Sequence, residues 1–156
     1  MAVTTFDGIA AIQAAVGQHL GFSDWTTVTQ EQVQTFADAT GDQQWIHVDV
    51  ERATAESPFG GPIAHGYLTL ALTNLFLPQV VDVQGVSLGV NRGTGKIRFP
   101  APVPVGSRLR AGVQLVAADD VAGEKPGVDT MMLITVEREG SDKPVCVVES
   151  LSRYLA

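Results

Sequence analysis

The sequence predicts an α+β fold in which one long buried helix is wrapped by a curved antiparallel β-sheet. Residues 63–77 are apolar on nearly every side, which is typical of a helix that is buried all round. From about residue 86 onwards, segments with strand patterns follow one another without intervening helices, which favours an antiparallel sheet. The chain has 156 residues, so we expect one domain over residues 1–156 with a single core.

The N-terminal region is predicted to contain a short helix and a short extended segment. Ile9 and Ile12 lie at helical spacing, so we expect an amphipathic helix over residues 7–16 that stops at Gly17. The segment Trp25–Val28 is interpreted as a brief strand or as an extended lead into the next helix.

A second helix is predicted to begin at Thr29. Gln32 follows Thr29 at the spacing of a capping box, in which each residue satisfies a free backbone N–H of the other. Val33 and Phe36 belong to its apolar stripe, and Gly41 is expected to end it.

The segment 42–62 shows little periodicity and is unusually long for a connection, which favours a functional loop. Asp49 can begin a turn of helix within it, and the Pro- and Gly-rich run Pro58–Pro62 closes it. The buried helix over 63–77 follows, and Pro78 is expected to terminate that helix because proline lacks the backbone N–H.

Alternation of apolar with polar or small residues then predicts the strands of the sheet. The last two predicted strands are joined by a hairpin turn at residues 140–143. The predicted strands are Val86–Val90, Lys96–Phe99, Leu109–Leu115, Val128–Glu139 and Pro144–Arg153.

Composition and charge exclude several classes of function. The net charge of −7 argues against general attraction to nucleic acid, because phosphate binding needs a surplus of Lys and Arg. No stretch approaches the roughly 18 apolar residues of a membrane span, and Met1–Phe6 lacks the features of a secretion signal. We therefore expect a cytoplasmic protein without a membrane partner.

The only cysteine, Cys146, lies in an apolar run and is expected to be a buried structural thiol.

Basic residues gather in one part of this acidic chain. No Asp or Glu occurs from Val83 to Ala118, yet half of the ten basic residues lie there. Two interpretations remain open: a solvated strand face, or a cradle for a polyanionic ligand. The residues concerned are Arg92, Lys96, Arg98, Arg108 and Arg110.

The loop after the second predicted helix contains an acid and an imidazole five residues apart. Asp42 and His47 could hold a water between them, with the carboxylate polarising the water and the imidazole moving a proton near neutral pH. The alternative is that Asp42 only caps a helix and that His47 is a solvated or core histidine without a catalytic role. Their position just after a helix stop favours a catalytic pair.

A second feature lies at the start of the buried helix, at His65 and Gly66. The first backbone N–H groups of a helix have no intrahelical partner, and glycine lets a ligand oxygen approach them closely. Such donors suit an oxygen that gains negative charge during a reaction. The alternative role for Gly66 is close packing of the helix against the sheet.

Three segments together resemble the MaoC-like (R)-specific enoyl-CoA hydratases, and most of all their short, stand-alone actinobacterial members. The hydratase motif of that family is similar to Phe36–Asp49 followed by Gly61–Gly66, and a strand–turn–strand signature is similar to Lys96–Gly106. The resemblance covers the chain from the capped helix to Gly106. It implies a hot-dog fold, a homodimer, and reversible syn hydration of a trans-2-enoyl-CoA to the (3R)-hydroxyacyl-CoA in fatty-acid metabolism.

The resemblance also implies roles for individual residues. Asp42 and His47 correspond to the catalytic pair, and the backbone N–H of Gly66 to the group that binds the thioester carbonyl oxygen. The family usually has Asn at the position of Gln44, where an amide helps to place groups at the site. His65 corresponds to a position taken as structural.

Because the resemblance implies a coenzyme A substrate, it also indicates which polyanionic ligand the basic stretch would bind. Arg98 and Arg108, or their neighbours, are expected to hold the phosphates of the coenzyme A substrate. No metal or redox cofactor is expected, because the three histidines of the chain are scattered and none is paired at the spacing used for zinc on a helix.

Two alternatives to hydration remain. A hot-dog thioesterase would attack the carbonyl carbon, but such enzymes tend to carry a carboxylate on the central helix, and residues 63–77 contain no Asp or Glu. A non-catalytic subunit that binds an acyl thioester would have no need for both Asp42 and His47.

Overall fold

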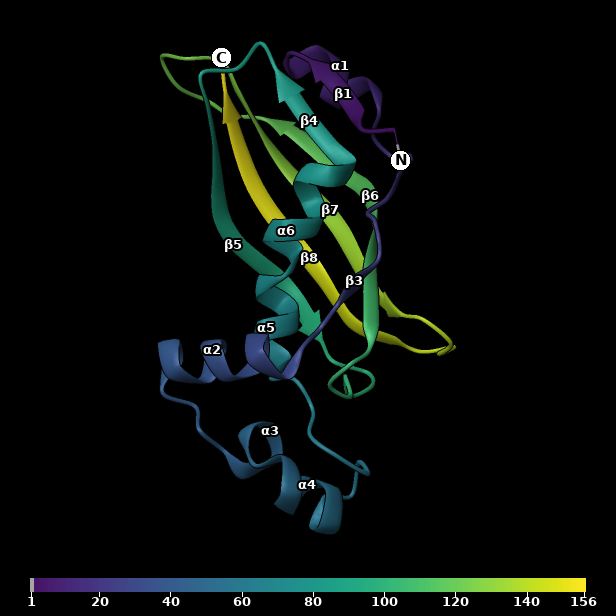
Figure 1. Cartoon of the computed structure of the whole chain (residues 1–156). Helices are drawn as coiled ribbons and strands as arrows, with labels where there is room; N and C mark the ends of the chain where they lie inside the picture. The colour runs from purple at the N-terminus through teal and green to yellow at the C-terminus, as the bar shows by residue number, and fades with distance from the viewer. Residues whose placement is uncertain (1) are drawn as a thin grey trace.

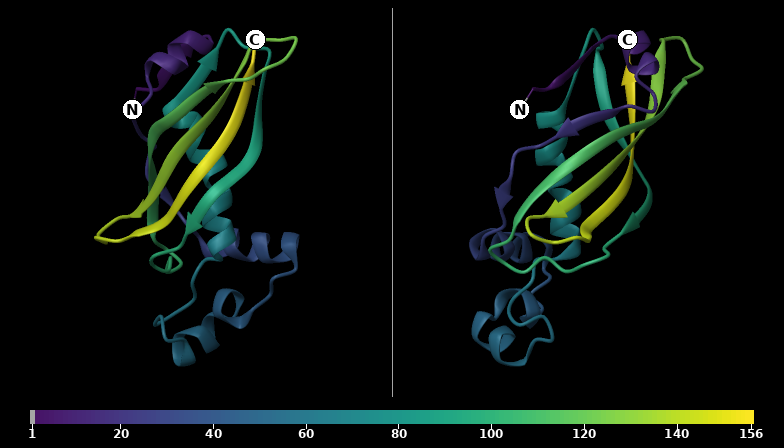
Figure 2. Two further views of the ribbon diagram at one scale, coloured as in Figure 1. Left: turned by 180° about the vertical axis from the view of Figure 1, so that it is seen from behind. Right: turned by 90° about the vertical axis from the view of Figure 1, so that its right-hand side faces the viewer.

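The computed structural model describes residues 2–156 and has the α+β architecture that the sequence predicts. A curved sheet wraps around the central helical segment, and a group of small helices lies beyond one end of the sheet (Figures 1 and 2). The helices are α1 (Ile9–Ala14), α2 (Gln30–Thr40), α3 (Trp45–Val48), α4 (Val50–Glu56), α5 (Gly66–Ala71) and α6 (Thr73–Val80). The strands are β1 (Thr4–Asp7), β2 (His19–Phe22), β3 (Thr26–Thr27), β4 (Val81–Gln84), β5 (Leu88–Arg98), β6 (Arg108–Asp120), β7 (Gly127–Arg138) and β8 (Pro144–Leu155).

The main sheet is antiparallel and runs in the order β2-β6-β7-β8-β5, with β3 also paired to β6. Strands β6, β7 and β8 are consecutive in the chain and pair along most of their lengths. Strand β5 pairs with β8 and forms one edge of the sheet. The two short strands β1 and β4 pair separately and are parallel, which the sequence did not predict.

One hydrophobic cluster joins the central helical segment to the inner face of the sheet. Phe76 and Val80 of α6 are fully buried against apolar side chains that alternate along β6 and β7. Cys146 is buried in this cluster as expected, and burial raises the pKa of its thiol to about 11. Within residues 2–156, no helix is long and apolar enough to cross a membrane.

The central helix differs from the prediction in its start. Helix α5 begins at Gly66, not at Ile63, because the preceding residues pair with another segment. Ile63 forms a β-bridge with Pro104, and the N–H of Ala64 donates to the carbonyl of Val103. The backbone of residues 62–64 is therefore occupied before the helix begins.

The prediction that Pro78 ends the helix is wrong. The helical segment is interrupted at Leu72 and then continues as α6 through Pro78 to Val80. A proline this near the end of a helix removes only one hydrogen bond, whereas the last turn buries Phe76 and Val80 completely. Burial therefore outweighs the lost hydrogen bond.

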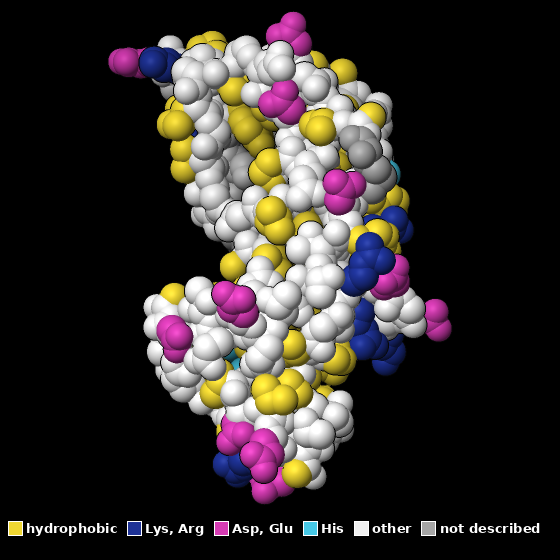
Figure 3. Space-filling view, in the orientation of Figure 1, with side chains coloured by type: hydrophobic (Ala, Val, Ile, Leu, Met, Phe, Trp, Pro, Cys, Tyr) yellow, Lys and Arg dark blue, Asp and Glu magenta, His cyan; other side chains and the backbone are white. Residues whose placement is uncertain are grey.

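The prediction that this helix is buried on every side is also wrong for the single chain. Tyr67 is 72% exposed and Leu75 is 45% exposed. With Ala71 and Pro78 they form an apolar stripe along one side of α5 and α6, which we call the exposed helix stripe. Figure 3 shows hydrophobic side chains in a hollow beside this part of the molecule, bordered by β5.

The N-terminal half agrees with the prediction in its helices more than in its strands. Helix α2 begins after Thr29, whose side chain accepts a hydrogen bond from the N–H of Gln32, and ends at Gly41 in the left-handed conformation. Helix α4 begins after Asp49 as expected. Helix α1 is shorter than the predicted 7–16, and strand β2 was not predicted.

Two predicted strands, Val86–Val90 and Lys96–Phe99, overlap the two ends of the single strand β5. Shifts in its register with β8 occur between Asn91 and Gly93 and between Thr94 and Ile97. Ile97 aside, all residues of β5 are exposed in the chain. The other predicted strands correspond to β6, β7 and β8 with small changes at their ends.

Candidate active site

Asp42 is held just beyond the end of α2. Gly41 adopts a left-handed conformation (φ 84°) that ends the helix and turns the chain, a conformation that glycine adopts at little cost. The Asp42 side chain is about half exposed, and its Oδ1 accepts a hydrogen bond from the N–H of Gln44 (3.3 Å). The carboxylate therefore lies in a loop, with one weak backbone anchor.

His47 is on the single turn of α3 and is almost completely buried. Its Nδ1 lies 2.6 Å from the carbonyl oxygen of Ile63, and its own carbonyl accepts a hydrogen bond from Gln30. A carbonyl can only accept, so the proton of the neutral ring is on Nδ1 and the lone pair is on Nε2. His47 is thus arranged as a base at Nε2.

The pKa of His47 lies below its ordinary value. Burial is the main cause, because it disfavours the charged imidazolium, and the nearby His65 acts in the same direction. The hydrogen bond to Ile63 and the charge of Asp42 act against this shift. The ring is consequently neutral and able to accept a proton near pH 7.

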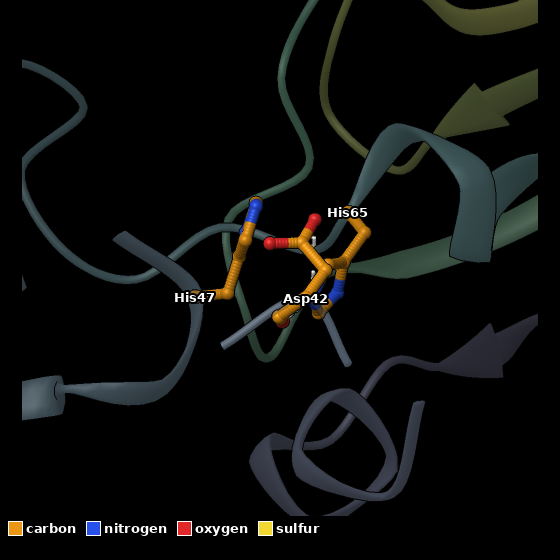
Figure 4. A group of neighbouring side chains, drawn as sticks. All are labelled: Asp42, His47 and His65. Carbon is orange, nitrogen blue, oxygen red and sulfur yellow. Dashed lines mark hydrogen bonds and ion pairs between the residues drawn. The ribbon is translucent and has the colours of Figure 1, made fainter. Parts of the chain in front are cut away.

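His65 and Gly66 stand at the start of α5 and meet Asp42 and His47 there. The Nε2 of His65 lies 3.0 Å from the backbone carbonyl oxygen of Asp42, and its ring is stacked on that of His47 with centroids 3.9 Å apart. Figure 4 shows the three side chains converging from separate segments of the chain.

Gly66 supplies free backbone donors at this point. The N–H groups of Gly66 and Tyr67 are in the first turn of α5 and donate no hydrogen bond within residues 2–156. A Cβ on Gly66 would lie 3.3 Å from the ring of Phe99, so a larger residue would crowd this position. Glycine here keeps the approach to the amide open.

These groups line one pocket of about 460 Å³. Apolar side chains cover most of its wall, and the polar groups are concentrated around Asp42 and His47, as is usual for sites that take small organic ligands. The lining residues are Phe36, Thr40, Asp42, His47, His65, Gly66, Tyr67 and Phe99.

The spacing of the polar groups suits a bridging water. One oxygen of Asp42 and one nitrogen of each histidine all lie within 4.8 Å of one another. A water that makes a hydrogen bond of about 2.8 Å to each of two groups spans roughly 4.5 Å. The carboxylate and the free Nε2 of His47 can therefore hold one water between them, beside the amide of Gly66.

The same three residues are close enough to be considered as metal ligands. However, the rings of His47 and His65 are nearly parallel (25°), so their in-plane lone pairs run side by side and do not converge on one point. One nitrogen of His65 is also engaged with the Asp42 carbonyl. This geometry fits a water better than a tetrahedral ion.

The structure brings together Asp42, His47 and Gly66, but not the other predicted binding residues. The side chain of Gln44 is exposed and does not line the pocket; the residue contributes through its backbone, as the N-cap of α3 and as a donor to Asp42. Its predicted contact with substrate stays a prediction.

Arg98 and Arg108 lie on strands separated by two others in the sheet, which corresponds to roughly 14 Å. Arg98 immediately precedes the pocket residue Phe99 and makes no ion pair within residues 2–156. Arg108 donates to both carboxylate oxygens of Glu139 at 2.9 and 3.1 Å. The two arginines therefore do not form one cradle within a single chain.

Four pocket residues were not assigned by sequence reasoning: Phe36, Thr40, Tyr67 and Phe99. Thr40 and Tyr67 are close neighbours in sequence of Asp42 and Gly66, and that proximity is the signal that could have identified them. Phe99 belongs to the strand–turn–strand signature but comes from a distant part of the chain.

A comparison with protein families is consistent with this geometry. A family model described as a MaoC like domain matches residues 11–137, which include the whole pocket. The chain belongs to the MaoC-like family. The resemblance inferred from the three sequence segments is thereby confirmed.

MaoC-like relatives extend the similarity to nearly the full chain. A 3-hydroxyacyl-thioester dehydratase Z of Mycobacterium tuberculosis (strain ATCC 25618 / H37Rv) is 55% identical over 152 residues, which cover 97% of this chain and 99% of the relative. The R-hydratase PhaJ1 of Pseudomonas aeruginosa, in its unliganded form, superposes with a TM-score of 0.68 at 26% identity, covering 88% of this chain and 79% of that chain.

A third similarity concerns the fold alone. A Mycobacterium tuberculosis protein with a double hot-dog fold superposes with a TM-score of 0.66 at 18% identity, covering 90% of this chain and 41% of that chain. The curved sheet around α5 and α6 is therefore the hot-dog fold, and the predicted fold class is confirmed.

Proposed function

We propose that this MaoC-like chain is a hydro-lyase of fatty-acid metabolism that interconverts trans-2-enoyl-CoA and (3R)-hydroxyacyl-CoA thioesters. The observation that carries this proposal is the placement of the Asp42 carboxylate within 4.8 Å of a nitrogen of His47, whose Nε2 is free to accept a proton, beside a free amide in one largely apolar pocket. The 55% identity to a protein named 3-hydroxyacyl-thioester dehydratase Z supports the same reaction.

In the hydration direction, Asp42 orients a water and Nε2 of His47 takes one of its protons while the water oxygen bonds to the β-carbon. The electrons of the double bond move toward the carbonyl, whose oxygen becomes an enolate and accepts the N–H of Gly66. The imidazolium of His47 then returns the proton to the α-carbon. Water and proton arrive from one side of the double bond, so the addition is syn.

The proposal is tested by two parallel readouts on crotonyl-CoA. Hydration removes the absorbance of the conjugated thioester without releasing a thiol, whereas hydrolysis releases free coenzyme A that a thiol reagent detects. We expect loss of absorbance with no thiol. Release of thiol at the same rate would identify a thioesterase, and no change in either readout would indicate a non-catalytic binding subunit.

The pH dependence follows from the lowered pKa of His47. The neutral ring is the active form in hydration, so kcat/KM falls as the pH drops through that pKa. Because the pKa is lowered, we expect the acid limb to lie below about pH 6.5, the ordinary value for histidine, with constant kcat/KM between pH 7 and that limb. A pH profile of crotonyl-CoA hydration measures this; an acid limb centred above pH 7 would contradict it.

We also propose that Arg98 binds a phosphate of the coenzyme A carrier at the mouth of the pocket. Arg98→Gln should raise KM by about threefold and weaken its dependence on salt, since an exposed charge pair contributes at most about 1 kcal/mol. Arg108→Gln should raise KM less, because the Arg108 guanidinium already pairs with Glu139. Initial rates at two salt concentrations check this, and a fall in kcat with KM unchanged would count against it.

We propose that the protein is a homodimer in which a second copy covers β5 and the exposed helix stripe. Strand β5 is an exposed sheet edge of 11 residues, and the stripe presents Tyr67 and Leu75 to solvent in the single chain. Tyr67 also lines the pocket, so a partner on this face would help to close the site.

Sedimentation at micromolar concentration should give about twice the 16.5 kDa chain mass. Val90→Lys on the β5 edge should shift the protein toward monomer, because it places a charge at the interface. Val116→Lys is a matched control, since Val90 and Val116 are 43% and 42% exposed and Val116 lies on β6 inside the sheet. A monomer that is fully active would overturn the dimer proposal.

We further propose that residues 1–156 form one domain, which the single hydrophobic cluster supports.

Catalysis by the Asp42–His47 pair needs no metal or redox cofactor, so chelator treatment should leave turnover unchanged. The thioesterase alternative is not favoured, because α5 and α6 carry no Asp or Glu.

A further inference from the structure

His65 makes contacts with both members of the Asp42–His47 pair but has no part in the reaction described above. It is 3% exposed and precedes α5 directly, as the residue that caps this helix without using its side chain. A buried histidine at this position therefore requires an explanation other than helix capping.

The hydrogen bonds of His65 define where its proton is. The Nε2 atom lies 3.0 Å from the carbonyl oxygen of Asp42, which can only accept, so Nε2 carries the proton. The Nδ1 atom is buried without a hydrogen-bond partner within residues 2–156. Burying an unpaired polar atom is unfavourable, and an apolar side chain of similar size would avoid that cost. Packing alone does not account for a histidine here.

The ring of His65 is held between two others. One face is stacked on His47 with an interplanar angle of 25°, and Phe36 contacts it in a tilted arrangement with centroids 4.9 Å apart. Phe36 is on α2, His47 is on α3, and His65 precedes α5. The ring therefore links the three segments that meet at the pocket.

The other restraints on the two catalytic groups act on the backbone around them and on one edge of the His47 ring. Apart from His65, the Asp42 carboxylate accepts a 3.3 Å hydrogen bond from the N–H of Gln44, and the side chain of the neighbouring Gln43 is hydrogen-bonded to α2. The hydrogen bond from Nδ1 of His47 to Ile63 fixes one edge of that ring but permits rotation about the bond. The stack on His65 fixes the plane of the ring.

We propose that His65 is a positioning residue for the hydration reaction: it sets the distance and the angle between the Asp42 carboxylate and the His47 imidazole. The Nε2–H anchors the Asp42 backbone, and the ring face orients His47. This inference rests on the proposed function of the Asp42–His47 pair. A misplacement of about 1 Å in a catalytic group can cost as much as 100-fold in rate, so loss of this control should be measurable.

Two substitutions separate the two contacts. His65→Gln keeps an N–H that can reach the Asp42 carbonyl but removes the ring, and His65→Phe keeps the stacked ring but removes the donor. We expect each to lower kcat for crotonyl-CoA by about tenfold or more while KM changes less than twofold, because positioning acts on the chemical step. Using two variants leaves one decisive measurement if the other does not fold.

A matched control tests whether any buried substitution in this helix has the same effect. Thr69 is 1% exposed and lies on α5, but its side chain does not line the catalytic pocket. Thr69→Val should keep kcat within twofold of wild type. An equal loss of kcat in Thr69→Val would assign the effect of His65 to packing and overturn the proposal.

A mutant cycle that treats the Asp42–His47 pair as one unit then tests whether His65 acts through that pair. In a background that already carries Asp42→Asn and His47→Gln, His65→Phe should lower the remaining rate by less than twofold, because no pair is left to position. A further tenfold loss would show that His65 acts independently and would refute the inference. Absence of hydration in the wild type would instead refute the proposed function.

Discussion

Asp42→Asn is expected to lower the turnover of crotonyl-CoA by at least about 100-fold, the usual contribution of a general acid–base group. The amide cannot carry the negative charge that polarises the water beside Nε2 of His47. The fold should be unaffected, because the side chain is about half exposed and an Asn oxygen can still accept the N–H of Gln44. Steady-state rates and the melting temperature together measure the two effects.

Asp142→Asn provides the control for the loss of a surface carboxylate. Asp142 is in the turn between β7 and β8 and does not line the pocket. Its substitution should leave turnover unchanged. If Asp42→Asn also kept near wild-type turnover with an intact fold, the assignment of Asp42 would be wrong.

His47→Gln should lower turnover by a similar factor, about 100-fold or more, because a glutamine amide cannot accept the proton of the attacking water. Its N–H can still donate to the carbonyl of Ile63, so the backbone of residues 62–64 should keep its place. The rate that remains should lose the acid limb that titration of His47 produces in the wild type.

His19→Gln is the matched control, because His19 is exposed on β2 and does not line the pocket. Turnover in this variant should equal that of the wild type. A His47→Gln enzyme with an unchanged rate and an unchanged pH profile would remove His47 from the mechanism.

Much of the fold could be predicted because long apolar patterns dominate it. Strand β7 alternates regularly, β8 begins with an apolar run, and the cap at Thr29 and the stop at Gly41 are local signals. Strands β1 and β2 have four residues each, with one buried residue apiece, so their pattern is too short to detect. Their partners, β4 and β6, lie far away in the sequence.

The start and end of the central helix depend on tertiary contacts that no local pattern reveals. Ile63 and Ala64 look helical in sequence but pair with residues 103 and 104. Pro78 looks like a terminator, yet burial of the final turn keeps it within α6. In both cases packing across the fold overrides local propensity.

For the basic stretch, the absence of acids nearby in the sequence was misleading, because acids from other segments lie close to it in the fold. Residues 83–118 contain no acid, but acids in β7 and just after it pair with basic side chains of β5 and β6. Arg108 pairs with Glu139, Arg110 with Glu137 and Arg92 with Asp129. For these three arginines, the solvated strand face is the better interpretation, and Arg98 is left as the stronger candidate for the ligand.

The candidate site was predictable where its chemistry is concentrated in one short motif. Asp42 and His47 are five residues apart, so the sequence could predict that they act together, and both line one pocket of the structure. The role that we infer for His65 could not be read from the sequence, because it depends on the carbonyl of Asp42 and on the face of a ring 18 residues away.

The most direct test of the central claim is the stereochemistry of hydration in heavy water. If the Asp42–His47 pair delivers water and proton to one face, crotonyl-CoA should yield (3R)-hydroxybutyryl-CoA with one deuterium at C2, placed syn to the new hydroxyl. Chiral chromatography and the proton coupling between C2 and C3 would measure both centres. A (3S) product, or deuterium distributed over both positions at C2 in initial product, would contradict the account.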